Sequence, residues 1–143
     1  MEKVSLTINW IAVKAPKGSS ILEAARSAGI YIPTLCYHKD LGPEGACRMC
    51  IVEASGAKGL VASCVYPVAE GMVVKTNTAK VREARRMVME LLLANHPKSC
   101  LTCRKSGDCE LQTMAANMGV RTHRFDWGER KVHTFDASNP CLV

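Results

Sequence analysis

The sequence predicts an α+β fold in which a small sheet surrounds one helix and a short helical segment follows. Three observations predict it: short runs of alternating apolar residues in the first half, a longer amphipathic helix after residue 78, and two aperiodic stretches rich in cysteine. The 143 residues allow one compact domain or two small ones. No run approaches the roughly 18–20 apolar residues that span a membrane, so we expect no direct membrane insertion.

The first two strands are predicted by alternation. Residues 4–8 alternate apolar and polar side chains, which is the period of a half-buried strand. Asn9 and Trp10 suit a turn into a second strand at residues 11–13. The Pro-Lys-Gly of residues 16–18 is expected to close this hairpin.

The first helix is predicted by its capping residues. Ser20 and Glu23 have the spacing of a capping box, in which each side chain satisfies a backbone N–H of the other residue. Gly29 supplies the C-cap. One helical face is apolar and comprises Ile21, Ala24, Ala25 and Ala28.

A long loop and three more strands complete the first domain, which we place at residues 1–77. Residues 33–50 have no periodicity and are rich in Gly, Pro and Cys, and a loop of this length inside a compact domain is usually functional. Short apolar runs follow at residues 51–54, 60–62 and 72–75, and each predicts a strand.

The second domain, residues 78–120, is predicted to be helical. A helix begins after Asn77 and Thr78 and runs to about residue 94, where Asn-His-Pro stops it. Its expected apolar stripe is Val81, Ala84, Val88, Leu91 and Leu92, and its expected solvated face is Lys80, Arg82, Glu83, Arg85 and Arg86. A shorter helix at residues 109–118 has Leu111, Met114, Ala115 and Met118 on one side and ends at Gly119. Residues 121–143 have the pattern of a surface tail with one or two short strands.

Seven of the eight cysteines, together with one histidine, form two sets with the spacing of metal ligands. The first set is Cys36, Cys47, Cys50 and Cys64, and the second is His96, Cys100, Cys103 and Cys109. Each set offers four soft or borderline ligands, as a tetrahedral iron or zinc site requires. The last cysteine, Cys141, has no partner array, and we interpret it as an ordinary small apolar residue.

Three kinds of chemistry compete for these cysteines. Zinc would use the pairs Cys47/Cys50 and Cys100/Cys103 but would leave the other four residues without a role. Disulfides or reactive thiols are the weakest alternative, because the chain starts without an export signal and we expect a cytoplasmic protein. Iron–sulfur clusters use every member of both sets. The small, glycine-bearing residues 43–50 also allow backbone amides to approach an anionic [2Fe–2S] cluster.

His96 is the least conventional member of the second set. A histidine between a helix end and a proline is more often a cap or a surface residue. Here it precedes a Cys-x2-Cys-x5-Cys loop that lacks a fourth thiolate nearby, and we interpret it as the missing ligand. A neutral imidazole in place of a thiolate removes one negative charge, which by itself makes reduction easier.

The two arrays together resemble one known family. The run Gly-Ala-Cys-Arg-Met-Cys-Ile-Val-Glu at residues 45–53, Ser63-Cys64 followed by Pro67-Val68, and the array that begins at His96 are similar to one N-terminal iron–sulfur region. This region is shared by the complex I large iron–sulfur subunit, iron-only hydrogenases, and NAD-linked hydrogenase and formate dehydrogenase subunits. The resemblance covers nearly the whole chain.

The resemblance implies a β-grasp, plant-type ferredoxin-like domain followed by a small helical domain that holds a cluster on one histidine and three cysteines. It implies one [2Fe–2S] cluster on the first set and one [4Fe–4S] cluster on the second. Single electrons would pass between a flavin-containing NAD(P)H-oxidising subunit or ferredoxin and a catalytic subunit or domain. The tail at residues 121–143 would lead toward a further domain that this chain does not include.

Charge and motifs limit the other functions. The formal charge of +6 would fall to about +3 once both clusters are bound, so the net charge no longer indicates nucleic-acid binding. We interpret the basic run at residues 80–86 as a solvated helix face rather than a docking patch for an acidic subunit. The chain has no Rossmann motif, P-loop or Ser/His/Asp arrangement, so we expect no catalytic site of its own. A structural zinc-binding assembly module is the alternative function.

Overall fold

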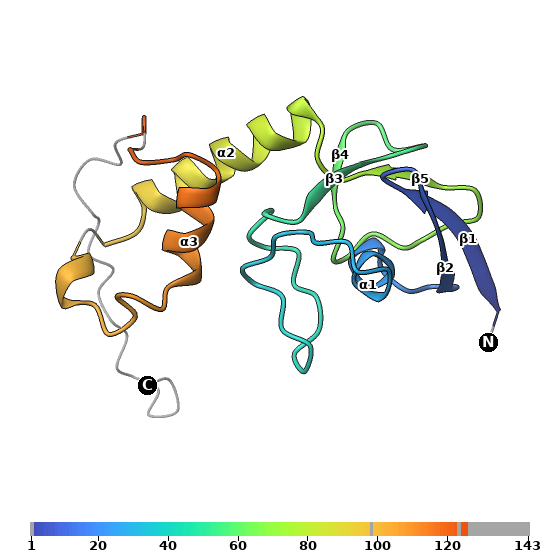
Figure 1. The fold of residues 1–143 in the computed structure, drawn as a ribbon, viewed down its shortest axis with the longest axis horizontal. Helices are drawn as coiled ribbons and strands as arrows, with labels where there is room; N and C mark the ends of the chain where they lie inside the picture. The colour runs from blue at the N-terminus through green and yellow to red at the C-terminus, as the bar shows by residue number, and fades with distance from the viewer. Residues whose placement is uncertain (1, 98, 123, 126–143) are drawn as a thin grey trace, which may run out of the picture.

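The computed structural model describes residues 2–97, 99–122 and 124–125. They form a mixed five-stranded sheet with one helix against it, and a second, helical part that α2 connects to the sheet (Figure 1). The predicted α+β class is therefore confirmed. The predictions for residues 126–143, including Cys141, lie outside the described residues.

The first hairpin is longer than the sequence pattern predicted. β1 (Lys3–Ile8) and β2 (Ile11–Pro16) pair antiparallel over their whole length, from Ile8 opposite Ile11 to Lys3 opposite Pro16. Asn9 and Trp10 close the hairpin with φ values of 48° and 71°, as a two-residue primed turn requires. The expectation that the second strand ends at residue 13 and that residues 16–18 close the hairpin is wrong, because ladder pairing continues to Pro16. Residues 16–18 lead into α1 instead.

The remaining strands extend the sheet from β1. β5 (Val73–Lys75) pairs parallel with β1, β3 (Ile51–Ala54) pairs antiparallel with β5, and β4 (Leu60–Ala62) lies at the edge beside β3. The order across the sheet is β2-β1-β5-β3-β4. The three predicted strands of this region are confirmed to within one residue.

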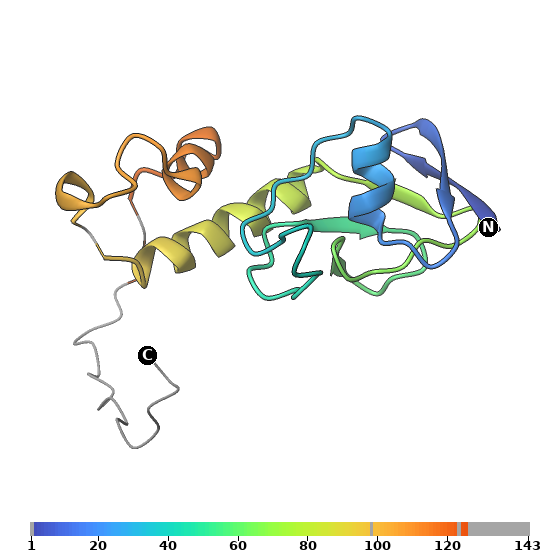
Figure 2. The same ribbon diagram turned by 90° about the horizontal axis from the view of Figure 1, so that it is seen from below.

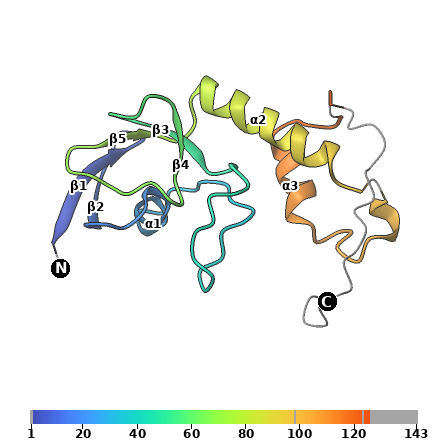
Figure 3. The same ribbon diagram turned by 180° about the vertical axis from the view of Figure 1, so that it is seen from behind.

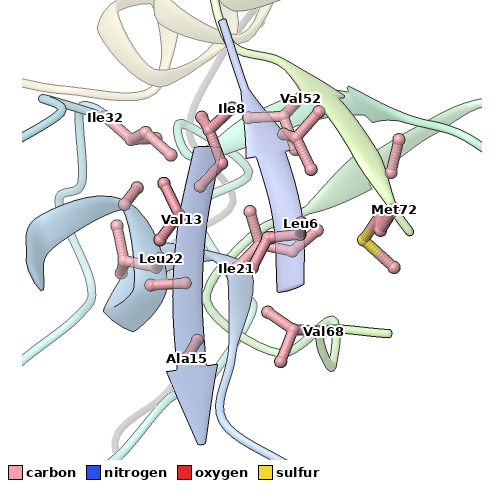
Figure 4. Close-up of a cluster of buried hydrophobic side chains, with 14 of the residues drawn as sticks. Leu6, Ile8, Val13, Ala15, Ile21, Leu22, Ile32, Val52, Val68 and Met72 are labelled. Carbon is pink, nitrogen blue, oxygen red and sulfur yellow. The ribbon is translucent and has the colours of Figure 1, made fainter. Parts of the chain in front are cut away.

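Helix α1 (Ile21–Ser27) packs against the hairpin and closes the first core (Figure 4). The predicted capping box is present: the Glu23 N–H donates to Ser20 Oγ at 3.2 Å, and the Ser20 N–H donates to the Glu23 carboxylate at 2.8 Å. Leu22, which the predicted apolar face omitted, is fully buried. The core also contains Leu6, Ile8, Val13, Ile21, Ile32, Val52, Val68 and Met72.

Helix α2 (Ala79–Ala94) leads away from the sheet and lies alongside α3 (Glu110–Asn117), as Figures 1 and 2 show. Thr78 caps α2 by accepting a hydrogen bond from the Val81 N–H, as predicted. A 3-10 turn, η1 (Cys100–Thr102), lies between the two helices and was not predicted. Among the described residues, none of the helices combines the length and apolar character needed to cross a membrane.

The buried side of α2 differs from the expected stripe. Its buried residues are Val81, Arg85, Met89 and Glu90, whereas Leu91 is 38% exposed. Val81, Arg85 and Met89 are spaced four residues apart and share one face. The pattern had assigned Arg85 to the solvated face because of its charge, and that assignment is wrong. Glu90 is buried with counter-ions: Arg124 Nε lies 2.8 Å and Arg86 Nε 3.6 Å from its carboxylate.

A second hydrophobic core joins the two parts of the chain. Its buried members are Met49, Met89, Met114, Ala115 and Val120. Met49 belongs to the long loop of residues 33–50, Met89 to α2 and Met114 to α3. The loop lies on the side of the sheet that faces α3 (Figures 1 and 3). This methionine core therefore fastens the loop to both helices.

Replacing Met89 tests the methionine core. Met89→Ala removes a fully buried side chain, and we expect it to lower the free energy of unfolding by about 2–5 kcal/mol. Met87→Ala is the matched control on the same helix, because Met87 is 45% exposed, and we expect a change below about 0.5 kcal/mol. Urea unfolding of the cluster-free, reduced chain followed by circular dichroism measures both. Equal effects of the two substitutions would contradict the assignment of Met89 to the core.

Candidate metal centres

The first cysteine set gathers at one end of the β3–β4 pair. Cys50 comes directly before β3 and Cys64 follows two residues after Ala62, the end of β4. Because Ile51 lies opposite Ala62 in the antiparallel ladder, both cysteines leave the sheet at the same end. Their Sγ atoms are 3.4 Å apart, and both residues are at most 2% exposed.

Cys36 and Cys47 form a second pair within the long loop. The Cys47 N–H lies 3.5 Å from the Cys36 Sγ and donates to it. Both residues are half-buried, whereas Cys50 and Cys64 are buried. The four residues thus form two contacting pairs, and together they supply the four cysteines that a two-iron cluster requires.

The loop backbone directs amide hydrogens at these sulfurs. Burial alone raises the pKa of Cys47, but backbone N–H groups of Met49, Leu35 and Cys36 hydrogen-bond to its sulfur and lower it below its usual value. Gly45 and Arg48 adopt left-handed conformations, with φ of 64° and 59°, on either side of Cys47. Glycine adopts this conformation freely, but at Arg48 it is strained, and strain of this kind persists where the surroundings enforce it, typically at a functional site. The backbone N–H groups of the loop thus favour the thiolate of Cys47.

Cys64 has the opposite tendency. Burial and the neighbouring sulfur of Cys50 together raise the pKa of Cys64 to about 11, although the Gly45 N–H acts in the opposite direction. A buried thiol beside a second sulfur resists losing its proton because negative charge there is poorly solvated in a medium of low dielectric constant. A bound cation removes this penalty, so the pair suits a metal rather than free thiolates.

The second set surrounds a single cavity. Its residues come from three elements: His96 follows α2, Cys100 and Cys103 lie in and after η1, and Cys109 is the N-cap of α3. All four line one cavity of about 170 Å³, which Leu93 and Leu111 also line. The Lys105 N–H donates to the Cys103 Sγ at 3.4 Å. His96, Cys100 and Cys103 are exposed, so this site opens toward solvent.

The structure therefore brings the residues of each predicted set close to one another, and the two sets lie at separate positions in the fold. In the part of the chain that the structure describes, no three His, Cys, Asp or Glu side chains close around a point as they would around one bound ion. The paired sulfurs of the first set and the cavity of the second fit multi-iron groups of four ligands each.

Arg85 is the residue near the first set that the sequence interpretation missed. It is 7% exposed, and its Nη2 donates to the backbone oxygen of Ile51, the residue after Cys50, at 2.7 Å. Burial lowers the pKa of Arg85 to about 10, so the guanidinium remains charged at neutral pH. The four-residue spacing of Arg85 from both Val81 and Met89 was a signal of burial on the same helix face. The sequence interpretation instead placed Arg85 on the solvated face because its side chain is charged.

Two family matches cover most of the chain. Residues 1–79 match the 2Fe-2S iron-sulfur cluster binding domain, and residues 85–124 match the NADH-ubiquinone oxidoreductase-G iron-sulfur binding region. These matches confirm the expected resemblance and one site for each kind of cluster. They favour iron–sulfur clusters over the alternative of a structural zinc module. The individual ligands and the domain boundaries stay predictions.

Named relatives are longer proteins. The chain is 46% identical over 143 residues to the NADP-reducing hydrogenase subunit HndD of Solidesulfovibrio fructosivorans, covering 96% of this chain and 24% of that protein. It is 46% identical over 123 residues to the mitochondrial NADH-ubiquinone oxidoreductase 78 kDa subunit of Neurospora crassa, covering 86% of this chain and 16% of that protein. The chain thus spans about a quarter or less of these curated relatives.

A solved structure has the same fold. It is a crystal structure of an NAD+-reducing [NiFe]-hydrogenase in the H2-reduced state. The similarity has a TM-score of 0.83 at 37% identity and covers 96% of this chain and 57% of that chain.

The close approach of Gly45 to Val65 provides a test of the first site. A Cβ at residue 45 would lie 3.2 Å from Val65 Cγ1. The backbone there is also left-handed, which costs a residue with a side chain about 1–2 kcal/mol. Gly42→Ala is the control, since it has the same backbone cost and no neighbour within 4 Å. We expect Gly45→Ala to lower the thermal midpoint more than Gly42→Ala does, and Val65→Ala to recover the difference.

Thermal unfolding of the reduced, cluster-free chain measures this series, and iron content after reconstitution reports on the site. Because Val65 follows Cys64, displacing it should also lower iron retention in Gly45→Ala. Equal losses in the two glycine variants, or no recovery with Val65→Ala, would contradict the contact.

Proposed function

Because this chain belongs to the 2Fe-2S iron-sulfur cluster binding domain family, we propose that it is an electron-transfer module of a multi-subunit NAD(P)H-linked oxidoreductase. The observation that carries the proposal is the joining of two complete four-ligand sets by one buried methionine core. A structural zinc module would need neither two sets nor a continuous packed connection between them.

Each set has its own ligand assignment. Cys36, Cys47, Cys50 and Cys64 hold the [2Fe–2S] cluster, and His96, Cys100, Cys103 and Cys109 hold the [4Fe–4S] cluster. When bound, such clusters accept and release single electrons. Within the first set the Cys50 and Cys64 sulfurs lie 3.4 Å apart and the Cys47 N–H donates to the Cys36 sulfur, so the four residues would hold the cluster as two neighbouring pairs.

The residues around the two sets hold the sites in place and keep water away from the first. Met49 lies between Cys47 and Cys50 and is fully buried, so its packing against α2 and α3 fixes the loop that carries both cysteines. The amide donors to the Cys47 sulfur lower the cost of a buried negative charge. α2 begins after β5, reaches the residue next to Cys50 through the Arg85 hydrogen bond to Ile51, and ends two residues before His96 of the second set, so it acts as a rigid spacer.

Partner subunits follow from the proposal and from the names of the relatives, which are subunits of a hydrogenase and of an NADH-ubiquinone oxidoreductase. We assign the chain a flavin-containing NAD(P)H-oxidising partner and a catalytic subunit or domain. The second site is where electrons cross to one of them, because Cys100 and Cys103 are exposed and Leu101 between them is 99% exposed. The first site, with two buried cysteines, is reached through the protein.

Counting iron and electrons tests the function. The chain reconstituted anaerobically should contain two irons from one cluster and four from the other, with equal acid-labile sulfide. Reductive titration with dithionite should consume two electrons per chain, and an added one-electron acceptor should recover them, since each cluster takes up one. A colourless zinc-containing chain, or irons that do not cycle, would overturn the proposal.

His96 is the sharpest test of the second site. His96→Ala should open a coordination position and make the [4Fe–4S] cluster labile or convert it to a three-iron form. His96→Cys should keep four ligands and lower the reduction potential, because it adds one negative charge. EPR of the reduced chain measures both, and the [2Fe–2S] signal should survive. His38→Ala is the control, since His38 lies in the first loop, away from the second cavity.

The contrary outcome is specific. If His96 only ends α2, both substitutions will leave the [4Fe–4S] spectrum and potential unchanged. His96 would then be removed from the site, and the fourth ligand would have to be a solvent molecule or another residue.

A further inference from the structure

Arg85 is a buried cation to which the proposed ligand sets give no role. It lies on α2 between Val81 and Met89, both fully buried, and its own exposure is 7%. A charge buried in protein is costly unless a counter-charge or hydrogen bonds compensate it. The contacts of Arg85 therefore indicate what it compensates.

Those contacts include no carboxylate. Within residues 2–97, 99–122 and 124–125, no acidic side chain forms an ion pair with Arg85. Its one hydrogen bond goes to the Ile51 backbone oxygen, and its Nε has no partner among the described atoms although it is buried. Glu90, the buried acid on the same helix, has two arginines beside it. Arg85 is thus the buried charge that the described residues leave uncompensated.

The first cysteine set lies beside Arg85 and becomes anionic when it binds a cluster. The hydrogen bond to Ile51 holds the guanidinium beside the residue that follows Cys50, where its charge attracts negative charge on the Cys50 sulfur. Cys50 is itself 2% exposed, so water screens this attraction little. Arg82, one turn earlier on α2, is exposed and donates instead to the Asn77 oxygen.

We propose that Arg85 is the counter-ion of the first cysteine set and raises the reduction potential of the cluster held there. This inference rests on the proposed function, because it needs the [2Fe–2S] cluster on Cys36, Cys47, Cys50 and Cys64. Two irons, two sulfides and four thiolates carry a net charge of about −2 when oxidised and about −3 after one electron is added. A fixed buried cation stabilises the more negative state more strongly, so it favours uptake of the electron.

The second set lies outside this influence. Arg85 does not line the cavity that His96, Cys100, Cys103 and Cys109 surround, and that cavity opens to solvent. Arg85 therefore changes the difference between the two potentials and with it the driving force for moving an electron between the two clusters. Arg85 is not a ligand itself; its charge acts on the cluster through the cysteine ligands.

Redox titration of the reconstituted full chain, followed by EPR, tests this. We expect Arg85→Gln to weaken the electron affinity of the [2Fe–2S] cluster at least tenfold, which is a negative shift of about 59 mV for a one-electron couple. Arg85→Lys keeps the charge and should stay within a few-fold of the unaltered chain. Arg82→Gln removes an exposed charge one turn away on the same helix and should leave the potential unchanged. The [4Fe–4S] potential should move less than the [2Fe–2S] potential in every variant.

Arg85→Leu guards against loss of folding. It continues the apolar face between Val81 and Met89, and replacing a buried charge with a well-packed apolar side chain is often neutral or stabilising. It should show the same negative shift as Arg85→Gln. A folded Arg85→Leu or Arg85→Gln variant whose [2Fe–2S] potential is unchanged would overturn the proposal, as would Arg85→Lys with the full shift. Failure of the proposed function is distinct, because the unaltered chain would then show no reversible [2Fe–2S] signal at all.

Discussion

The packing of Met49 is the constraint on which both sites depend. A loop that brings cysteines together has few regular backbone hydrogen bonds, so a side chain must hold it in place. Met49 does so from between Cys47 and Cys50, where it contacts the same buried core as Met89 on α2 and Met114 on α3. The first site therefore has its geometry set partly by the helices, and α3 begins at Cys109 of the second site. One apolar core thus includes Cys47 of the first set and, through Leu93 and Leu111, borders the cavity of the second.

Electrostatics differ between the two sites in a consistent way. The first set is buried and receives positive compensation from fixed groups: amide hydrogens at the Cys47 sulfur and the guanidinium beside Cys50. The second set has two exposed cysteines and a histidine in place of a fourth thiolate, so solvent and ligand charge contribute more there. The two cluster sites of this chain therefore have different electrostatic surroundings. Different surroundings are what separate their potentials, and a separation of potentials gives electron transfer a preferred direction.

The sequence allowed much of the fold and site to be predicted because the decisive signals are local. The capping box at Ser20, the N-cap at Thr78 and the cysteine spacings each depend on residues close in the chain. The burial of Arg85 and Glu90 was missed because hydrophobicity alone assigns charged residues to solvent, whereas in the structure Glu90 pairs with Arg86 and Arg124 and Arg85 donates to the Ile51 oxygen. The length of β2 was missed because pairing with β1, not alternation, determines where that strand ends.

The methionine core also bears on how the chain is divided. A boundary after residue 77 separates the sheet from the helices along the sequence, but Met49 and Leu35 from the first segment pack with Met89 and Met114 from the second. Cutting the chain there would expose part of this core on both sides. The two segments differ in sequence and in the kind of cluster that each matches. Side chains from both segments nevertheless pack together beside the loop that carries the first ligand set.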